Sequence, residues 1–425
     1  MMFQRYCNPS VALTALLLLP WCLIHFRHCG NAFQGSPMFV VNEKQQPTST
    51  TSTSTTTRHP TTTRLFSNNN NLDKGFNLLE LASSNPLVPQ GLIVRTAKEG
   101  WKFAWSRMMA ELAPQDKTGS YQRPRYGFVL GDDAPFVDEP GRYHLYVGNP
   151  CPWCHRAVLA LNVLGINNND GNDVTNIQKV GVTVLQDDPV KASRGGWVFS
   201  SQHPDPLGNG DLRQLYDQLK PGYKGRCTAP LLIDKKRRTI ISNESSDIVR
   251  MLNRGTFGSQ TAPSERINLY PPQLRRDIDD TNEWVYQLLN NGVYRCGFST
   301  TQDAYNRASA DVQSGLDRVE EILQKQDYLV SPSEFTEADL RLIPTMLRFD
   351  GAYSPLFKAG GVHLRIQSDY PAIHAWMKRC WNDIPGVKTS IDLADACSSY
   401  YKQLFPLNPG GIIPTPVTAR DLGLE

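Results

Sequence analysis

The chain has 425 residues, of which 40% are hydrophobic and 20% are charged, as in soluble globular proteins. Its formal net charge of +3 is small for this length, so we expect no nucleic acid partner. Nine cysteines are too few for a disulfide scaffold, and no second Cys or His pair at zinc-site spacing accompanies the Cys-x-x-Cys sequence. The composition therefore predicts a core large enough for two domains and no metal site.

Residues 1–32 have the plan of a signal peptide, with Arg5 ahead of an apolar run and small residues after it. The run, at residues 11–24, is about 14 residues long and contains Pro20, whereas a membrane-spanning helix needs roughly 20 residues. A transmembrane anchor is the alternative interpretation. We expect the mature chain to carry none.

Residues 33–72 are rich in Ser and Thr, and residues 45–72 contain no Asp or Glu. Such a composition is typical of a transit peptide, which does not need to form a core. With Phe33 at the junction, the segment resembles the second half of the bipartite plastid presequences of algae with secondary plastids. We therefore predict a plastid location. A secreted protein with a disordered linker is the alternative.

The rest of the chain is expected to form an α/β domain followed by an all-helical domain. Residues 73–131 show no sustained periodicity, and we interpret them as an extension that wraps the next domain. Residues 132–255 then read as strand, helix and strand, which favours a parallel pairing, followed by a hairpin and a second helix. Residues 265–425 show helical apolar spacing, with a capping box that begins at Thr336.

Cys151 lies between the first predicted strand and the first predicted helix. At a helix N-terminus, unpaired backbone N–H groups and the helix dipole favour the thiolate form of a cysteine. Pro152 suits the first helical turn, and His155 and Arg156 offer additional positive charge. We predict that Cys151 is a catalytic nucleophile; a buried structural thiol is the alternative.

Cys154 completes a Cys-x-x-Cys sequence with Cys151. Such a pair can cycle between dithiol and disulfide, with Cys154 resolving a mixed disulfide on Cys151. A small apolar residue that faces the core is an equally good interpretation.

A second candidate site begins at Ala229-Pro230, ahead of an apolar strand. In thioredoxin-like domains such a proline is cis and leaves the preceding backbone able to pair with an extended peptide. Further on, Glu244 and Ser245 open a helix, where they can hold the ammonium and the carboxylate of an α-amino acid. A simple capped helix start is the alternative.

Five segments together resemble the Xi class of the glutathione transferases, the glutathionyl-hydroquinone reductases, and the likeness runs from about residue 100 to residue 414. They are residues 143–156, 196–199, 243–252, 291–298 and 348–350. The resemblance implies a thioredoxin-like domain followed by an all-helical glutathione-transferase domain, in a homodimer. The chain differs from the family pattern at Cys154, where a small non-thiol residue is more common, and at Ala229, where Val is common.

The resemblance also implies a reaction and the residues that perform it. The thiolate of Cys151 would attack the sulfur of a glutathionyl-hydroquinone, and a second glutathione would release the mixed disulfide. Tyr294 and Tyr353 would line the pocket for the aromatic group, with Tyr400 or Tyr401 as a further member, or these tyrosines would be core residues. The residues implied to contact the co-substrate glutathione are Trp197, Ala229, Pro230, Glu244 and Ser245.

Two other functions remain open at this point. An Omega-like dehydroascorbate reductase or glutaredoxin-type deglutathionylase would use the same cysteine and the same glutathione site, and Cys154 favours it. A non-catalytic protein that binds glutathione conjugates would not need Cys151.

Overall fold

The computed structural model describes residues 89–124, 127–131, 135–167, 179–188, 190–257 and 266–425. The predicted signal and transit segments lie outside these residues, as does the first part of the predicted extension. The chain divides into two compact units, residues 1–104 and 105–425. The described residues of the first unit belong almost entirely to helix α3 (Gln90–Leu112), which continues into the second.

A mixed five-stranded sheet forms the centre of the α/β domain, in the order β3-β2-β1-β4-β5. Strand β1 is parallel to β2 and antiparallel to β4, and β4 and β5 form a hairpin, as predicted. The register places Leu145 opposite Val182 on one side and Leu232 on the other. The strands are β1 (Tyr143–Gly148), β2 (Gly181–Asp187), β3 (Trp197–Val198), β4 (Leu231–Asp234) and β5 (Thr239–Ser242).

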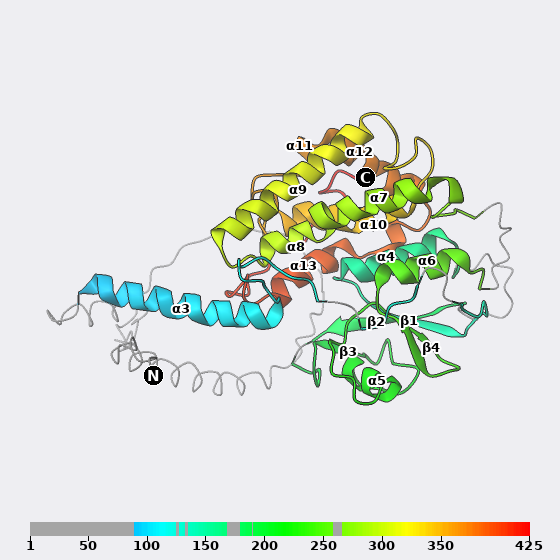
Figure 1. The fold of residues 1–425 in the computed structure, drawn as a ribbon, viewed down its shortest axis with the longest axis horizontal. Coiled ribbons are helices and arrows are strands. Elements are labelled where there is room, and N and C mark those ends of the chain that lie inside the picture. The colour runs from blue at the N-terminus through cyan, green and yellow to red at the C-terminus, as the bar shows by residue number, and fades with distance from the viewer. Residues whose placement is uncertain (1–88, 125–126, 132–134, 168–178, 189, 258–265) are drawn as a thin grey trace, which may run out of the picture. The chain divides into compact units, whose positions relative to one another are not determined.

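Helices cover both faces of this sheet (Figure 1). Because successive side chains of a strand point to opposite faces, Leu145 and Val147 pack with α4 (Pro152–Val163) and α6 (Ser245–Arg254). Tyr146 faces the other way and packs with α5 (Leu212–Leu219). This arrangement places the start of α4, and with it Cys151, just beyond the end of β1.

The second domain is helical, as predicted, and its helices enclose a continuous apolar core. The predicted capping box is present at the start of α10. The side chain of Thr336 accepts from the backbone N–H of Asp339, and the side chain of Asp339 accepts from the backbone N–H of Thr336. The helices are α7 (Arg275–Val285), α8 (Gly292–Gly297), α9 (Gln302–Leu323), α10 (Glu337–Arg348), α11 (Ile366–Asp369), α12 (Pro371–Asp383) and α13 (Leu393–Gln403). Short 3-10 or π turns occupy Pro272–Leu274, Tyr286–Asn290, Phe349–Tyr353 and Lys388–Ser390.

The extension contains one long helix, α3, which the sequence did not indicate because residues 73–131 show no sustained periodicity. Only Met109 of its residues is buried, so no apolar stripe marks the helix in the sequence. After α3 the chain contacts both domains. The backbone N–H of Phe128 donates to the side-chain oxygen of Asn243 at 3.1 Å, and the ring of Tyr121 meets that of Phe298 edge-on at 5.4 Å.

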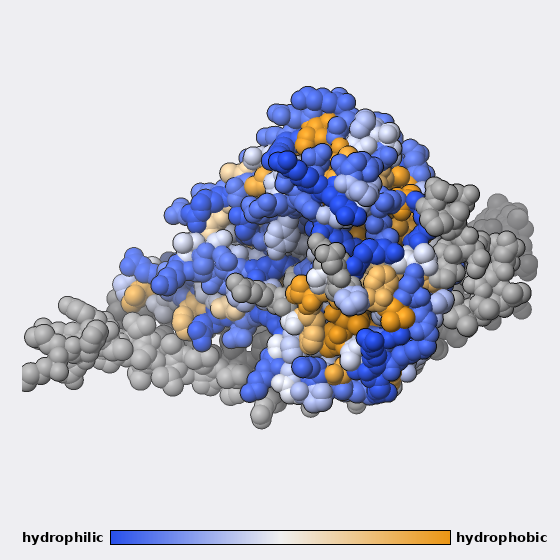
Figure 2. Space-filling view, turned by 45° about the vertical axis from the view of Figure 1, so that its right-hand side comes forward, coloured by the Kyte–Doolittle hydropathy of each residue, from blue (hydrophilic) through white to orange (hydrophobic). Residues whose placement is uncertain are grey.

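The surface is mainly hydrophilic on the face that Figure 2 shows, with apolar residues gathered in one area of its lower half. Within the described ranges, no helix combines the length and the hydropathy that crossing a membrane requires.

Candidate active site

Cys151 is the N-cap residue of α4, with extended backbone angles (φ −79°, ψ 116°) and Pro152 in the first helical turn. Its sulfur accepts a hydrogen bond from the backbone N–H of Cys154 at 3.4 Å. The local sequence explains this geometry, because β1 ends at Gly148 and a proline in the first helical turn needs no N–H partner. The half-buried thiol therefore lies at the positive end of the helix.

The pKa of the Cys151 thiol is lowered from the ordinary cysteine value to about 7. Burial acts in the opposite direction and raises this pKa. The thiol and the backbone N–H of Cys154, together with the charge of Arg123 and the backbone of Trp153, more than offset burial. A large fraction of Cys151 is therefore thiolate near neutral pH, which is the form that attacks sulfur.

Cys154 is 1% exposed and belongs to the apolar core, yet its thiol also interacts with that of Cys151 and lowers the pKa of Cys151. Burial and the neighbouring Cys151 raise its pKa well above the ordinary value. The two interpretations of Cys154 therefore do not exclude each other, because the same side chain packs in the core and touches the nucleophile.

His155 and Arg156 do not supply the positive charge that the sequence suggested for Cys151. Burial and the charge of Arg348 lower the pKa of His155 well below its ordinary value, so the ring is neutral. The guanidinium of Arg156 stacks on Trp153, with 4.5 Å from its carbon to the ring centre, and donates to the side-chain oxygen of Asn290 at 2.6 Å. The helical domain therefore holds Arg156 through this hydrogen bond.

Arg348, at the end of α10, holds the loop that precedes the nucleophile. Its guanidinium is fully buried and donates to the carbonyl oxygens of Asn149 at 2.9 Å and Pro150 at 3.1 Å. A third hydrogen bond reaches Nδ1 of His155 at 3.0 Å. Since a guanidinium only donates, Nδ1 accepts and the imidazole proton lies on Nε2, 2.7 Å from the Ser390 hydroxyl.

Two residues of the site escaped prediction from the sequence. Arg348 lies in a segment that carried the family resemblance, but no role was expected for it. A charged residue at the end of an otherwise apolar helical run is the available signal, since an arginine in a core needs specific partners. Arg123, in the extension, stacks on Trp153 with 3.9 Å from its guanidinium carbon to the ring centre. No motif marked it.

Glu244 and Ser245 begin helix α6, as predicted. One carboxylate oxygen of Glu244 accepts from the backbone N–H of Ser246 at 3.0 Å, and from the Ser245 hydroxyl at 3.3 Å. The capped helix start is therefore real. Among the contacts of the described residues, these bonds use Oε1 of Glu244, which leaves Oε2 as an acceptor for a ligand.

The remaining predicted glutathione contacts lie around the nucleophile. The Ala229-Pro230 bond is cis, and the Cys151 thiol lies 3.7 Å from the carbonyl oxygen of Ala229. The indole of Trp197 lies against Gly148, where a Cβ atom would come within 2.4 Å of the ring. Only glycine permits this approach, which brings Trp197 to the end of β1 from which the Cys151 loop departs.

Three tyrosines converge in the helical domain and form a cluster of phenols, which we call the phenol cluster (Tyr294, Tyr353, Tyr400). The hydroxyl of Tyr400 lies 2.7 Å from that of Tyr353 and 3.0 Å from that of Tyr294. Tyr353 and Tyr294 are 3.5 Å apart at their hydroxyls. Tyr401, the other expected candidate, instead donates to the carbonyl oxygen of Gly351 at 3.2 Å and does not join the cluster.

All three phenols are neutral near neutral pH. Burial, the neighbouring Tyr353 and the charge on Cys151 raise the pKa of Tyr294 well above its ordinary value. Burial also raises the pKa of Tyr353 and of Tyr400. The three hydroxyls hydrogen-bond one another, and the longest of these contacts, at 3.5 Å between Tyr294 and Tyr353, is the one that a ligand oxygen would replace most easily.

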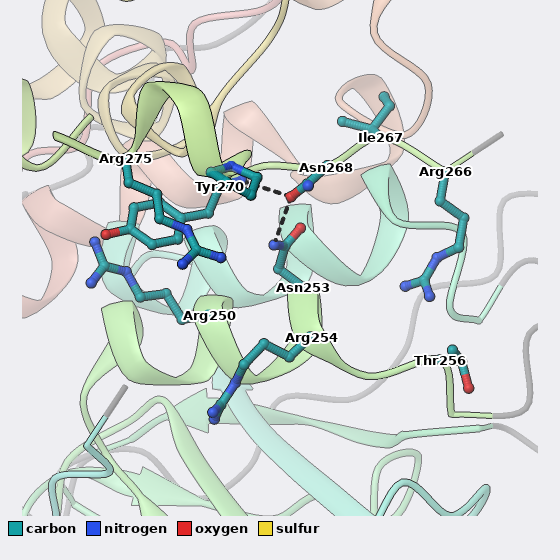
Figure 3. A pocket seen from close by; sticks show the side chains of 10 residues that line it. Arg250, Asn253, Arg254, Thr256, Arg266, Ile267, Asn268, Tyr270 and Arg275 are labelled. Atoms are coloured by element: carbon teal, nitrogen blue, oxygen red, sulfur yellow. Dashed lines mark hydrogen bonds between the residues drawn. The ribbon is translucent and has the colours of Figure 1, made fainter. Parts of the chain in front are cut away.

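A separate cavity of about 560 Å³ lies at the other end of α6 and contains none of the predicted site residues (Figure 3). Arg250 and Arg275 both stack on Tyr270 there, at 4.2 and 5.2 Å from the ring centre. Arg250 is also paired with Glu337 and Asp279. Within the part of the chain that the structure describes, no group of three or more His, Cys, Asp or Glu side chains is placed to hold a metal ion.

The two domains match two family profiles. Residues 150–254 match the N-terminal domain of glutathione S-transferases, and residues 302–379 match the C-terminal domain. Fold and site together therefore define a glutathione transferase with a cysteine at the active-site position.

Individual relatives narrow this class. The chain is 35% identical to the glutathionyl-hydroquinone reductase YqjG of Escherichia coli, over 69% of this chain and 88% of the relative. It is 36% identical to the glutathionyl-hydroquinone reductase PcpF of Sphingobium chlorophenolicum, over 74% of this chain and 93% of the relative. The chain belongs to the Xi class of the glutathione transferases.

Solved structures of Xi-class glutathione transferases are also similar to this chain. The Xi glutathione transferase of Phanerochaete chrysosporium is 36% identical with a TM-score of 0.62, over 71% of this chain and 94% of that structure. The glutathione-bound structure of Escherichia coli YqjG is 34% identical with a TM-score of 0.59, over 72% of this chain and 96% of that structure.

Proposed function

We propose that this protein reduces glutathionyl-hydroquinones to hydroquinones with glutathione as the co-substrate. The observation that carries the proposal is the juxtaposition of an activated thiol with a group of neutral phenols. The charge of Cys151 acts on Tyr294 and Tyr353, so the nucleophile and the phenol cluster share one electrostatic environment. Its similarity to relatives named as glutathionyl-hydroquinone reductases supports the same reaction.

The reaction follows from the chemistry of these groups. The thiolate of Cys151 attacks the glutathione sulfur of the conjugate, a mixed disulfide forms, and the bond between sulfur and the aromatic ring breaks. The electron pair of that bond passes to the ring carbon, which takes up a proton. A neutral phenol of the cluster can donate a hydrogen bond to an oxygen of the hydroquinone and favour this departure. A glutathione thiolate then attacks the mixed disulfide and yields oxidised glutathione.

Binding of glutathione is proposed for the residues around Cys151. Glu244 would accept from the ammonium group, and the backbone N–H groups at the start of α6, including that of Ser245, would donate to the neighbouring carboxylate. Ala229, next to the cis Pro230, contacts the nucleophile and would pair with the peptide backbone of glutathione. Trp197 would cover the bound peptide from the start of β3.

Turnover of a glutathionyl-hydroquinone tests the proposal. We expect Cys151→Ser to lose at least about 10³-fold in kcat/KM, because the hydroxyl is a poor nucleophile toward sulfur and forms no disulfide. Cys227→Ser, which changes a half-buried thiol elsewhere in the α/β domain, is the control. Full activity of Cys151→Ser would refute this mechanism, whereas a wild type that shows no turnover either would leave a non-catalytic binding protein as the better account.

A second candidate activity is reduction of dehydroascorbate or of glutathionylated thiols. The contact between Cys154 and Cys151 favours it, because a paired thiol suits the reduction of disulfides. Comparing kcat/KM for the two substrate types decides between them. If the wild type has the higher kcat/KM for the glutathionyl-hydroquinone, and Tyr353→Phe loses this preference, the aromatic conjugate is the substrate.

We further propose that residues 1–72 direct the protein to a plastid and that the mature chain forms a homodimer. The proposal on location rests on the signal-like and Ser/Thr-rich segments. A fluorescent protein fused behind residues 1–72 should accumulate in plastids of an alga with secondary plastids. Secretion of the fusion would overturn the assignment. Light scattering of the mature chain tests the dimer.

A further inference from the structure

Two thiols of different accessibility meet at the start of α4. Cys151 is half-buried, whereas Cys154 is 1% exposed and lies behind it in the core. The backbone N–H of Cys154 lies 3.4 Å from the sulfur of Cys151, and the interaction of the two thiols lowers the pKa of Cys151 and raises that of Cys154. A substrate can therefore approach Cys151, whereas the natural partner of Cys154 is Cys151 itself.

We propose that Cys154 resolves the mixed disulfide between Cys151 and glutathione from inside the protein. The inference rests on the proposed function, because that reaction produces the mixed disulfide. The Cys154 thiolate attacks the Cys151 sulfur, a Cys151–Cys154 disulfide forms, and the bond to glutathione breaks. Glutathione leaves as a thiolate and takes up the proton that Cys154 released.

The electron balance of the overall reaction is unchanged by this step. One glutathionyl-hydroquinone and the two reduced thiols give hydroquinone, glutathione and the internal disulfide. Two glutathione molecules then reduce the internal disulfide and leave as oxidised glutathione. The sum is again one conjugate and one glutathione converted to hydroquinone and oxidised glutathione.

Burial of Cys154 does not prevent the step. Cys154 needs no access to solvent, because the sulfur that it attacks is already its neighbour across one turn of helix. Attack by an external glutathione requires a second molecule to enter while the first still occupies the site. The internal route avoids this requirement and protects Cys151 from remaining blocked.

The charge of Cys151 acts as a trigger for Cys154. Burial is the largest cause that raises the pKa of Cys154. The next two causes are hydrogen bonding to Cys151 and the negative charge of the Cys151 thiolate. A Cys151 in a mixed disulfide carries no charge, so the effect of that charge disappears when the resolving step is needed. The backbone of Gly148 and the charge of Arg348 continue to lower the pKa.

A single turnover distinguishes the internal route from the external one. Enzyme is mixed with an equal amount of a glutathionyl-hydroquinone in the absence of free glutathione, then alkylated and weighed by mass spectrometry. We expect the wild type to release both hydroquinone and glutathione, and to become lighter by two hydrogen atoms. Peptide mapping should locate the new disulfide at Cys151–Cys154.

The decisive variant is Cys154→Ser, because a hydroxyl keeps a hydrogen-bond donor for Cys151 but cannot form a disulfide. It should release hydroquinone, retain one glutathionyl group on Cys151, and release glutathione at least about 10-fold more slowly than the wild type. Cys154→Ala repeats the test without a buried hydroxyl. Cys380→Ala, which removes another buried thiol from α12, should behave as the wild type.

The outcomes distinguish a failure of the internal resolving step from a failure of the proposed reductase activity. If the wild type retains glutathione on Cys151 as long as Cys154→Ser does, the internal route is overturned and the external reaction stands. If neither protein releases hydroquinone, the proposed function itself fails. A disulfide between Cys151 and any other cysteine would also overturn the role of Cys154.

Discussion

The loop around the nucleophile and the phenol cluster differ in how the chain assembles them. Cys151 and Cys154 interact across one turn of α4, and most groups that lower the pKa of Cys151 come from residues 151–154. The phenol cluster joins α8, the turn at Phe349–Tyr353 and α13, through tyrosines that are 59 and 47 residues apart in the chain. Local backbone geometry therefore creates the nucleophile, whereas packing of the helical domain creates the group that would receive the aromatic ring.

Arg348 connects the two regions. It comes from the helical domain, binds the carbonyl oxygens just before Cys151, and its charge also lowers the pKa of Tyr353 and of Tyr400 against the effect of burial. Changes at Arg348, in the phenol cluster and beside Cys151 should therefore affect activity in different ways.

Replacing Arg348 should disturb both regions at once. Arg348→Gln leaves the carbonyl oxygens of Asn149, Pro150 and Pro344 without their donors, so we expect unfolding free energy to fall by roughly 3 kcal/mol or more. A displaced loop should also lower kcat/KM by about 10²-fold. Chemical denaturation and steady-state kinetics measure the two effects.

The control for Arg348 is Arg341→Gln, on the same helix. Arg341 pairs with Glu337, so its loss should lower stability with little change in the pH dependence of kcat/KM. Arg348→Lys, which keeps the charge but not the planar set of donors, should recover only part of the activity. Equal kinetics for Arg341→Gln and Arg348→Gln would show that Arg348 acts only through stability.

Removing one hydroxyl of the phenol cluster should impair the aromatic substrate specifically. We expect Tyr353→Phe to lower kcat for a glutathionyl-hydroquinone by about 10²-fold, because a proton donor near the departing ring is lost. Reduction of a small glutathione mixed disulfide, which has no aromatic leaving group, should change little. Tyr401→Phe loses only the hydrogen bond to Gly351 and serves as the matched control. An equal loss of kcat for both substrates would show that the Tyr353 hydroxyl supports the structure and not the departure of the aromatic group.

The smallest effect is expected at Arg123, whose charge lowers the pKa of Cys151. Because the thiolate is the reactive form, kcat/KM should rise with pH through the Cys151 pKa of about 7. Removing the charge in Arg123→Gln raises that pKa, so the profile should move to higher pH by a fraction of a unit. The loss at slightly acidic pH is then about two- to threefold. Arg123→Lys keeps the charge and should keep the profile; a shift toward lower pH in Arg123→Gln would contradict the assignment.

Features that depend on neighbours in the chain could be predicted from the sequence. Alternating and helical apolar patterns identified β1, β2, β4 and β5 and the helices α4, α6, α7, α9 and α10, but not β3 and α5. The prolines beside Cys151 indicated the start of α4. The capping box at Thr336 could be predicted for the same reason, since its two partners are three residues apart. Helix α3 was missed because its exposed surface carries no apolar stripe.

Which charges and hydroxyls meet depends on how distant segments of the chain pack together. His155 follows Cys151 by four residues, yet burial and the charge of Arg348 make it neutral, and Arg156 donates to Asn290 in the helical domain. Tyr400 joins the phenol cluster and Tyr401 does not, although they are adjacent in the chain. The physical reason is that a helix presents successive residues in different directions, so the packing of α13 against its neighbours selects one hydroxyl.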